Sequence, residues 1–294
     1  MLRRSRVALS VALTALLTLG VSAEPVQRAQ FIDTFTWHLE DPAFGGFSAL
    51  EISDDGQSFT AVSDRAHIVR GTFEREKGQI KRIALGPIQP LLGLNGEIPQ
   101  REKGDSEGLA IGEDGRLYIS FEGENRVWEY RGKQPEPLPR AKAFETMQQN
   151  GGLEALAIDG NGWLYTLPER SGQLNLDFPI FRFRNGAWDQ PFSIPRTGPF
   201  LAVGADFGPD GRLYLLERRF TGLSFGSRVR RFDVTDTSIS RGETLLETRN
   251  GQFDNLEGLS VWRDAEGRIR LTMISDDNFN FFQSTQLVEY AVTE

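Results

Sequence analysis

The sequence predicts an all-β protein, a β-propeller built from blades of four antiparallel strands. One phrase, an apolar run, a tight turn and a second apolar run, occurs five times, at residues 47–64, 106–122, 153–169, 202–217 and 256–276. The turns are mostly Asp-Gly or Asn-Gly, which is typical of two-residue hairpins. The glycines of successive turns lie 47 to 59 residues apart, a period that suits one blade per repeat.

Two more strand-like segments follow most of the hairpins, so four strands per blade is the simplest count. The last repeat supplies only residues 285–292 as its third strand, whereas residues 31–39 form an unmatched strand at the front. We therefore expect the N-terminal strand to complete the last blade and close the ring. Five blades are visible, and residues 68–95 leave open a diverged sixth. Segment 143–149 is the one helix candidate, and it is short.

The first 23 residues have the pattern of a secretory signal. Arg3, Arg4 and Arg6 precede an apolar run at residues 7–19, and small residues then lead to Ala23. We expect cleavage after Ala23 and a mature single-domain propeller, residues 24–294, in the periplasm or outside the cell. The alternative is a membrane anchor, but the 13-residue run is shorter than the ~20 residues that span a bilayer. No membrane span is expected in the mature chain.

Composition excludes several kinds of site and partner. The chain has no cysteine, which rules out disulfides and Cys-ligated zinc or iron–sulfur centres. Its 41 acidic residues exceed its 33 basic ones, for a net charge of −8, and no basic block is present. A nucleic-acid partner is therefore not expected. The charge favours a cation or a small molecule as partner.

Acidic residues recur at the open end of the hairpins. Residues equidistant from a two-residue turn face each other across the two strands. This register predicts three facing carboxylate pairs, Glu107 with Glu122, Glu154 with Glu169, and Glu257 with Asp276. Asp64 and Glu217 end the second strand of the other two repeats, and Asp206 is the substitute partner for Glu217 if its strand is bulged. Because the first strand of each blade lines the central channel, we expect a ring of acids at one end of the propeller.

Such a ring needs a counter-charge, because like charges in one cleft oppose ionisation. Arg65, Arg170, Arg218 and Arg219 follow the acids directly and can form structural ion pairs with them. The other device is a divalent cation, Ca²⁺ or else Mg²⁺, since the ligands are oxygens and the only histidines are His38 and His67. The candidate ligands are Asp64, Glu107, Glu122, Glu154, Glu169, Glu217, Glu257, Asp276, Asp277 and Asn278, the last three forming the densest cluster.

Two serine motifs of the form G-x-S-x-G are discounted. Ser106 and Ser224 are their central residues. A nucleophile elbow requires a strand–turn–helix, whereas Ser106 begins a predicted strand and Ser224 lies in a predicted loop. We therefore expect no serine-hydrolase triad.

These motifs together resemble the phytase-like domain family, labelled "esterase-like activity of phytase". The resemblance covers roughly residues 44–294. It implies an exported β-propeller whose acidic residues support hydrolysis of a phosphoester or a related ester. Blade four departs from the pattern, because Val203-Gly204-Ala205-Asp206 stands where neighbouring repeats have Glu-Gly-Leu or Glu-Ala-Leu. The motifs that carry the resemblance are Gly45-Gly46-Phe47-Ser48-Ala49-Leu50, Ser63-Asp64-Arg65, Glu107-Gly108-Leu109-Ala110, Glu154-Ala155-Leu156-Ala157, Glu169-Arg170, Glu217-Arg218, Glu257-Gly258-Leu259 and Ser275-Asp276-Asp277-Asn278-Phe279.

Three functional hypotheses follow. The first is a hydrolase of a small phosphorylated or ester substrate, in which channel carboxylates hold the cation, a carboxylate acts as general base and arginines neutralise the substrate. Its catalytic candidates are Glu107, Glu154, Glu257, Arg65, Arg170 and Arg218. The second is a non-catalytic propeller that binds a ligand or a protein. The third is a lactonase-type metal propeller, with Asn125, Asn255 or Asn278 completing the ligands.

Overall fold

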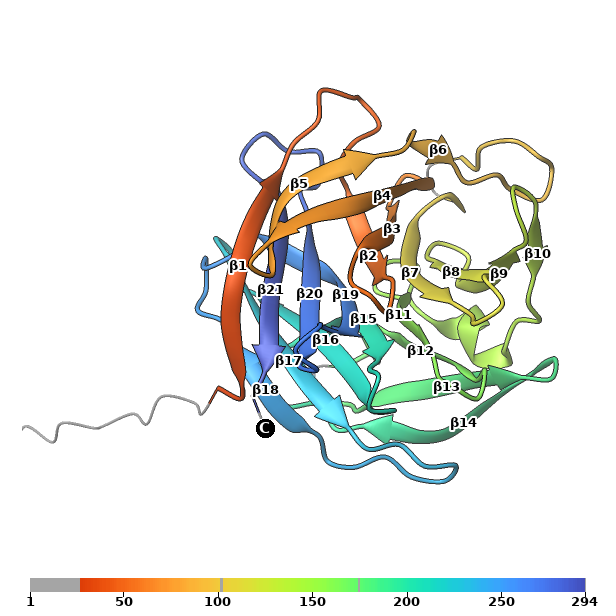
Figure 1. The fold of residues 1–294 in the computed structure, drawn as a ribbon. Helices are drawn as coiled ribbons and strands as arrows, with labels where there is room; N and C mark the ends of the chain where they lie inside the picture. Colours follow the sequence, from red (N-terminus) through yellow and green to blue (C-terminus); the bar gives the residue numbers. More distant parts are fainter. Residues whose placement is uncertain (1–26, 101–102, 174, 294) are drawn as a thin grey trace, which may run out of the picture.

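The computed structural model describes residues 27–100, 103–173 and 175–293, and in this part of the chain five sheets surround a central axis (Figure 1). The predicted signal at residues 1–23 lies outside the described residues. The five-bladed antiparallel propeller is confirmed. Segment 143–149 was expected as a helix, and residues Lys142–Thr146 form a 3-10 helix. No helix of the described residues is long and apolar enough to cross a membrane.

Each blade runs outward from its first strand, which lies nearest the axis. Blade one contains β2 (Phe47–Ile52), β3 (Ser58–Ser63), β4 (His67–Glu76) and β5 (Gln79–Leu85), with β6 (Gln89–Pro90) paired to β4. Blade two contains β7 (Ser106–Ile111), β8 (Leu117–Phe121), β9 (Arg126–Tyr130) and β10 (Pro135–Pro137). Blade three contains β11 (Leu153–Ile158), β12 (Leu164–Pro168), β13 (Phe178–Arg184) and β14 (Ala187–Ile194). Blade four contains β15 (Leu201–Phe207), β16 (Leu213–Phe220), β17 (Phe225–Phe232) and β18 (Glu243–Glu247).

Blade five is assembled from both ends of the chain. Its strands are β19 (Asn255–Arg263), β20 (Ile269–Asp276), β21 (Thr285–Val292) and β1 (Ala29–Trp37). β1 pairs antiparallel with β21, and the two lie side by side in Figure 1. The predicted closure of the ring by the N-terminal strand is therefore confirmed. The diverged sixth blade at residues 68–95 was wrong, because this segment forms the outer strands β4, β5 and β6 of blade one.

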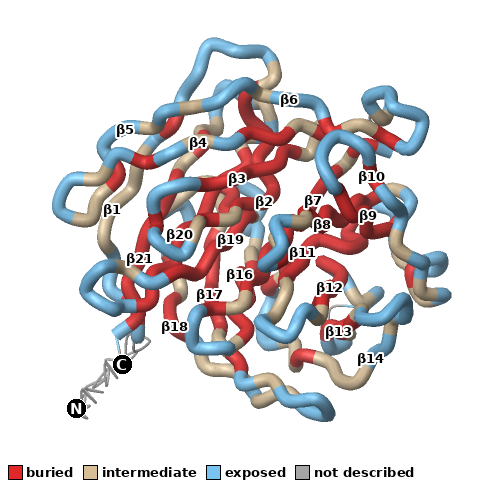
Figure 2. Tube along the Cα trace, turned by 45° about the vertical axis from the view of Figure 1, so that its right-hand side comes forward, coloured by how far each residue is buried: buried red, intermediate tan, exposed pale blue. Residues whose placement is uncertain are grey.

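The hydrophobic core lies between neighbouring blades rather than at one centre. Five clusters of buried side chains fill the five interfaces between blades. Figure 2 shows the buried residues along the strands and the exposed ones in the connecting loops. Burial of apolar area contributes about 25 cal/mol per Å², so these interfaces are the main stabilising contacts of the ring.

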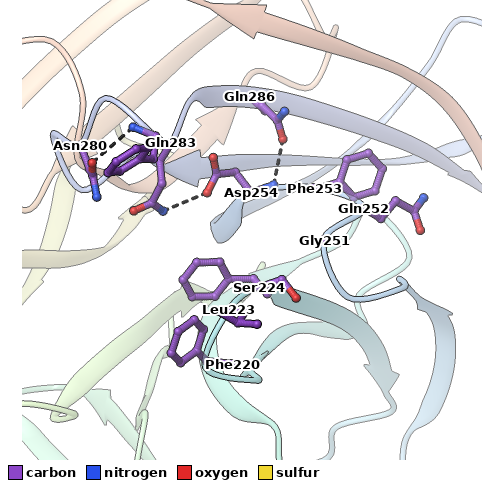
Figure 3. Close-up of a pocket in the computed structure, with 12 residues that line it drawn as sticks. Phe220, Leu223, Ser224, Gly251, Gln252, Phe253, Asp254, Asn280, Gln283 and Gln286 are labelled. Carbon is purple, nitrogen blue, oxygen red and sulfur yellow. Dashed lines mark hydrogen bonds between the residues drawn. The ribbon is translucent and has the colours of Figure 1, made fainter.

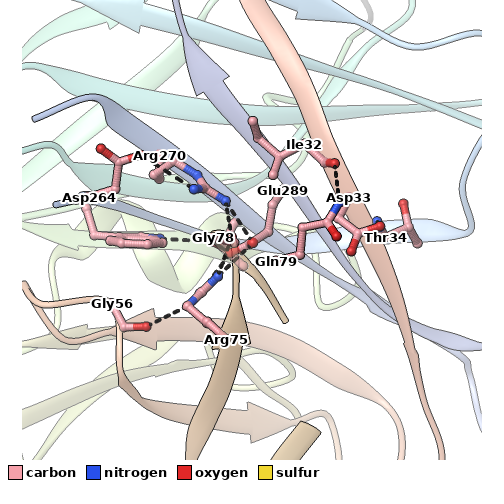
Figure 4. Close-up of polar contacts among 12 residues, drawn as sticks. Ile32, Asp33, Thr34, Gly56, Arg75, Gly78, Gln79, Asp264, Arg270 and Glu289 are labelled. Carbon is pink, nitrogen blue, oxygen red and sulfur yellow. Dashed lines mark hydrogen bonds and ion pairs between the residues drawn. The ribbon is translucent and has the colours of Figure 1, made fainter. Parts of the chain in front are cut away.

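A buried ion cluster reinforces the junction where the chain ends meet. The carboxylate of Glu289 in β21 is 1% exposed and accepts hydrogen bonds from Arg75 of blade one at 2.8 and 2.9 Å. Arg270 and Thr272 in β20 each donate a further bond of 2.9 Å to it. Figure 4 shows Arg75 and Arg270 converging on Glu289. Charged hydrogen bonds thus tie blade one to blade five across the closure.

Candidate functional site

Each of the five innermost strands contains a register shift near its start. The shifts lie at residues 47–49, 106–109, 153–155, 202–204 and 256–258. A β-bulge leaves an extra residue out of the ladder and re-aims its side chain. In three blades the shift contains a glutamate, namely Glu107, Glu154 or Glu257. We call the end of the axis at which these strands begin the carboxylate end.

The observed bulges and turns give the hairpins a register that differs from the predicted one. In blade two, Gly112 N–H donates to the Arg116 carbonyl at 2.9 Å and Gly115 has a φ of +78°. The loop therefore contains three residues, with glycine in the left-handed position, rather than two. Glu122 consequently pairs through its backbone with Asp105, at 2.9 Å, and not with Glu107.

The same correction applies to the other two predicted pairs. Glu169 pairs with Gly152 through a backbone hydrogen bond of 2.9 Å, and Asp276 stands opposite Asn255. Glu154 and Glu257 instead lie within the register shifts. The carboxylates still gather at one end of the propeller, but they do so through the bulges and not through facing positions.

Asp105, Glu107 and Glu122 form the tightest group of carboxylates. Each offers an oxygen, and these three oxygens lie within 4.8 Å of one another. Glu107 and Glu122 are buried, whereas Asp105 is half-buried. Burial, followed by the charges of Asp105, Glu122 and Glu257, raises the pKa of Glu107 well above its ordinary value. A positive charge bound near this group would favour the ionised form of Glu107.

Backbone amides orient one member of this carboxylate trio. Oε1 of Glu122 accepts hydrogen bonds of 2.6 Å from the N–H groups of Gly151 and Gly152. The neighbouring Glu154 shares a carboxyl hydrogen bond with Glu122. Burial and the charges of Glu107, Glu122 and Glu169 raise the pKa of Glu154 well above its ordinary value. Blades two and three therefore place four carboxyl groups together.

Arg218 neutralises the opposite side of the ring. Its Nη2 donates to Oε1 of Glu169 at 2.7 Å, and its Nη1 donates to Oδ1 of Asn255 at 2.7 Å and also contacts Glu257. Asn255 donates in turn to Glu257 at 2.8 Å. Despite burial, the charges of Glu257, Glu169 and Glu154 raise the pKa of Arg218 above its ordinary value. One guanidinium thus balances carboxylates from blades three and five.

The predicted cluster Asp276-Asp277-Asn278 lies at the end of β20 and in the loop that follows it. Oδ1 of Asp277 accepts N–H bonds from Gly46 at 2.9 Å and Phe279 at 3.0 Å, and Oδ2 accepts the Thr285 hydroxyl at 3.0 Å. Oδ1 of Asp276 accepts the N–H of Asn278 at 2.6 Å. Burial and the charge of Glu257 raise the pKa of Asp276 to about 9. Asp277 therefore fixes the loop, and Asp276 adjoins Glu257 of the central acids.

Asp64 and Arg65 lie beside this loop. The Arg65 guanidinium stands 3.2 Å from the ring centroid of Phe279, a cation–π contact. Gly46 has a φ of +62°, and a Cβ there would collide with Asp64 and Phe279. Close packing therefore holds Arg65 at the rim of the carboxylate end.

Glu217 and Arg219 pair with residues other than each other or Arg218, whereas Arg170 pairs with its neighbour Glu169 as expected. Each oxygen of Glu217, which is 0% exposed, accepts bonds from both Arg228 and Arg230 at 2.6 to 3.0 Å. Arg219 pairs with Glu247 at 2.7 Å, on the outer side of its blade. Arg170 donates to Oε2 of Glu169 at 2.9 Å. Glu217 is therefore fully occupied by arginines, as a structural ion pair.

Asp206 does not replace the missing carboxylate of blade four. It stands opposite Tyr214, near the other end of β15, and Oδ2 accepts the N–H of Val261 at 2.6 Å. The strand is bulged as the expectation required, but its bulge contains Val203. Ser106, the centre of one discounted serine motif, is buried, and its hydroxyl donates to the carbonyl of Ser63 at 2.5 Å.

One residue of the site was missed from the sequence, and another was assigned only a minor role. Asp105 lies one position before β7. Its position two residues before Glu107 was the only feature of the sequence that could have indicated it as a site residue. Asn255 was named only as an extra ligand, although it links Arg218 to Glu257. The conjectured ligand Asn125 is structural, because its Oδ1 accepts the N–H of Leu153 at 3.0 Å. The residues that come together are Asp105, Glu107, Glu122, Glu154, Glu169, Glu257, Asp276, Asn255 and Arg218.

Comparison with known proteins now identifies the family. The model of the phytase-like family, described as "esterase-like activity of phytase", matches residues 42–279. The chain belongs to the phytase-like family. The expected resemblance is therefore confirmed over most of the chain. No curated protein matches the sequence.

Solved structures resemble this phytase-like chain in fold. An aldose sugar dehydrogenase from Streptomyces coelicolor is 13% identical, with 88% of this chain and 98% of that one covered and a TM-score of 0.47. A gluconolactonase from Xanthomonas campestris is 14% identical, with 79% and 68% covered and a TM-score of 0.45. A streptogramin B lyase is 12% identical, with 87% and 97% covered and a TM-score of 0.40. At these values the likenesses carry no argument about activity.

Proposed function

We propose that this phytase-like propeller is a divalent-cation-dependent hydrolase of phosphoesters or related esters. The observation that carries the proposal is the trio Asp105, Glu107 and Glu122, whose oxygens lie within 4.8 Å of one another in a largely buried setting. Arginine contacts neutralise Glu169, Glu217 and Glu257, whereas burial and the charges of neighbouring acids raise the pKa of Glu107 within the trio. A cation is the counter-charge that fits there.

The donor set fits a hard cation. All three ligands are carboxylate oxygens, which suits Ca²⁺, with Mg²⁺ as the alternative. One oxygen of Glu122 is held by two backbone amides, which orients the carboxylate without supplying a charge. A bound cation of this kind polarises an ester or phosphoryl oxygen and lowers the pKa of bound water.

The protein's own side chains supply the remaining roles. Glu154 adjoins Glu122 but lies outside the trio, so its carboxylate is placed to accept a proton from the attacking water. The water oxygen forms the new bond to phosphorus or carbonyl carbon, the ester bond to the leaving oxygen breaks, and that oxygen takes up a proton. Arg218, with Arg170 and Arg65 at the rim, would face the negative oxygens of the substrate. Glu257 is held by Arg218 and Asn255, which makes it a positioning residue for that guanidinium.

Hydrolysis assays test this proposal directly. Phosphomonoesters, carboxylesters and lactones would be assayed with Ca²⁺, with Mg²⁺ and after chelation. Glu107→Gln should abolish a cation-dependent activity, whereas the matched control Glu266→Gln, at a turn where the side chain is 66% exposed, should retain it. Activity that survives chelation or Glu107→Gln would contradict the proposal. Hydrolysis of lactones alone would favour the lactonase-type alternative.

A second candidate is a propeller that binds a ligand or a protein without catalysis. The observation that favours it is the arginine pairing of Glu169, Glu217 and Glu257, in which arginines supply counter-charge to buried acids. Export to the periplasm or beyond, expected from residues 1–23, remains a prediction for either function. Absence of both cation binding and hydrolysis would favour this candidate.

A further inference from the structure

Exposed apolar side chains gather on two loops at the carboxylate end. Leu223 is 97% exposed and Phe220 59% exposed, at the connection between β16 and β17. Phe281 and Phe282, 86% and 79% exposed, lie in the connection between β20 and β21 with ring centroids 3.7 Å apart. Both connections follow the second strand of a blade, since β16 ends at Phe220 and β20 ends at Asp276. Solvent exposure of four large apolar groups at one place calls for an occupant.

A pocket of about 500 Å³ separates the two loops. Figure 3 shows Phe220, Leu223 and Ser224 on one side, and Asp254, Gln283 and Gln286 across from them. The residues that line it, among those described, include no lysine or arginine, and Asp254 is the one acid. Its Oδ1 accepts the amide of Gln283 at 2.9 Å and its Oδ2 accepts the N–H of Ser284 at 2.8 Å. Neutral amides line part of the pocket, and five apolar side chains line the rest, so the pocket suits an uncharged group that carries apolar surface.

The pocket adjoins the candidate site through one aromatic ring. Phe225 lines the pocket, and the Arg218 guanidinium carbon lies 5.8 Å from the centroid of that ring. Arg218 is the residue that binds Glu169 and Glu257. Asp254, at the pocket wall, directly precedes Asn255, which bonds both Arg218 and Glu257. A molecule with its polar end near Arg218 can therefore place an apolar end between the loops.

We propose that this pocket binds the acyl or aryl group of an amphiphilic ester substrate. The inference rests on the proposed function for its substrate and adds the substrate's chemical class. Leu223 and Phe282 form the apolar walls, and Phe225 separates the apolar group from the charged residues. Substrates that carry only small polar groups would leave these walls exposed to water.

Binding of alkylphosphonates, which cannot be hydrolysed as esters, tests the inference by titration calorimetry in the presence of Ca²⁺. Affinity should rise roughly two- to fourfold for each methylene added between methyl- and octylphosphonate, because each buried CH₂ contributes favourably. The double variant Leu223→Ala/Phe282→Ala should lose this dependence on chain length, while methylphosphonate binding stays unchanged. Leu94→Ala removes a 56% exposed leucine outside the pocket and is the matched control.

The outcomes separate this inference from the proposed function. Chain-length dependence that is lost only in the double variant supports the pocket, even if no ester is hydrolysed and the proposed hydrolase falls. Equal affinity for all chain lengths overturns the inference, and so does a dependence that the double variant retains. Leu223- and Phe282-dependent dimerisation or vesicle binding without chain-length dependence would assign the surface to another occupant and also overturn it.

Discussion

Arg218 of blade four donates a hydrogen bond of 2.7 Å to Glu169 of blade three. The same guanidinium contacts Glu257 of blade five, so a single side chain joins three blades at the axis. Its side chain is 17% exposed, and that of Glu169 is 4% exposed. Arg218 therefore supplies positive charge to the acids of blades three and five.

Replacing Arg218 should therefore destabilise the protein. Arg218→Met leaves Glu257 without its arginine partner and Glu169 with Arg170 alone, and breaking a buried pair from one side costs about 3–5 kcal/mol. The free energy of unfolding, measured in urea, should fall by roughly this amount. Arg219→Met removes the adjacent, outer arginine and should cost no more than about 1 kcal/mol. Equal losses in the two variants would contradict the role of Arg218.

Glu289 should be as important for the stability of the ring closure as Arg218 is for the carboxylate end. Glu289→Gln removes the charge that Arg75 and Arg270 share, which leaves two guanidinium groups close together. We expect a loss of about 3–5 kcal/mol in unfolding free energy. Glu243→Gln, which weakens two contacts of a 32% exposed carboxylate with Arg28 and Arg231, is the comparison and should cost less. A larger loss in that control would show that closure does not depend on Glu289.

Asp206, at the end of the axis opposite the carboxylate end, should make the stability of the protein depend on pH. Burial raises the pKa of Asp206 from 3.8 to about 7. The folded state therefore binds the proton more tightly than the unfolded state, and the contribution of Asp206 to stability is lost as pH rises from about 4 to about 7. Asp206→Asn should remove this loss. The free energy of unfolding of the variant, relative to that of the wild type, should therefore increase as pH rises. Parallel stability curves across this range would contradict the shift.

Much of the fold was predictable because its signals are local. Asp-Gly and Asn-Gly turns mark the hairpins, and the unmatched strand near Phe31 implied closure of the ring. The sixth blade was wrong because long outer strands such as β4 and β5 resemble an additional repeat when only their apolar residues are considered. Repeat length alone does not assign a strand to a blade.

The site was predictable in composition but not in geometry. The acids of the repeats were identified, yet a three-residue loop and a bulge change the residue that faces Glu122 from Glu107 to Asp105. The choice of arginine partners depends on contacts between blades. Glu217, next to Arg218 in sequence, pairs instead with Arg228 and Arg230 on the neighbouring strand.

Calcium binding tests the central claim most directly. Ca²⁺ would be titrated into metal-stripped wild type, Glu107→Gln and Glu266→Gln, with heat and thermal unfolding as readouts. We expect one saturable site in the wild type and Glu266→Gln, and at least about tenfold weaker binding in Glu107→Gln. At about 100 times the Kd the ligand should add about 2.7 kcal/mol, a rise of several degrees in Tm. No heat and no rise with Ca²⁺, Mg²⁺ or Mn²⁺, or equal binding by Glu107→Gln, would contradict the claim that Asp105, Glu107 and Glu122 hold a cation.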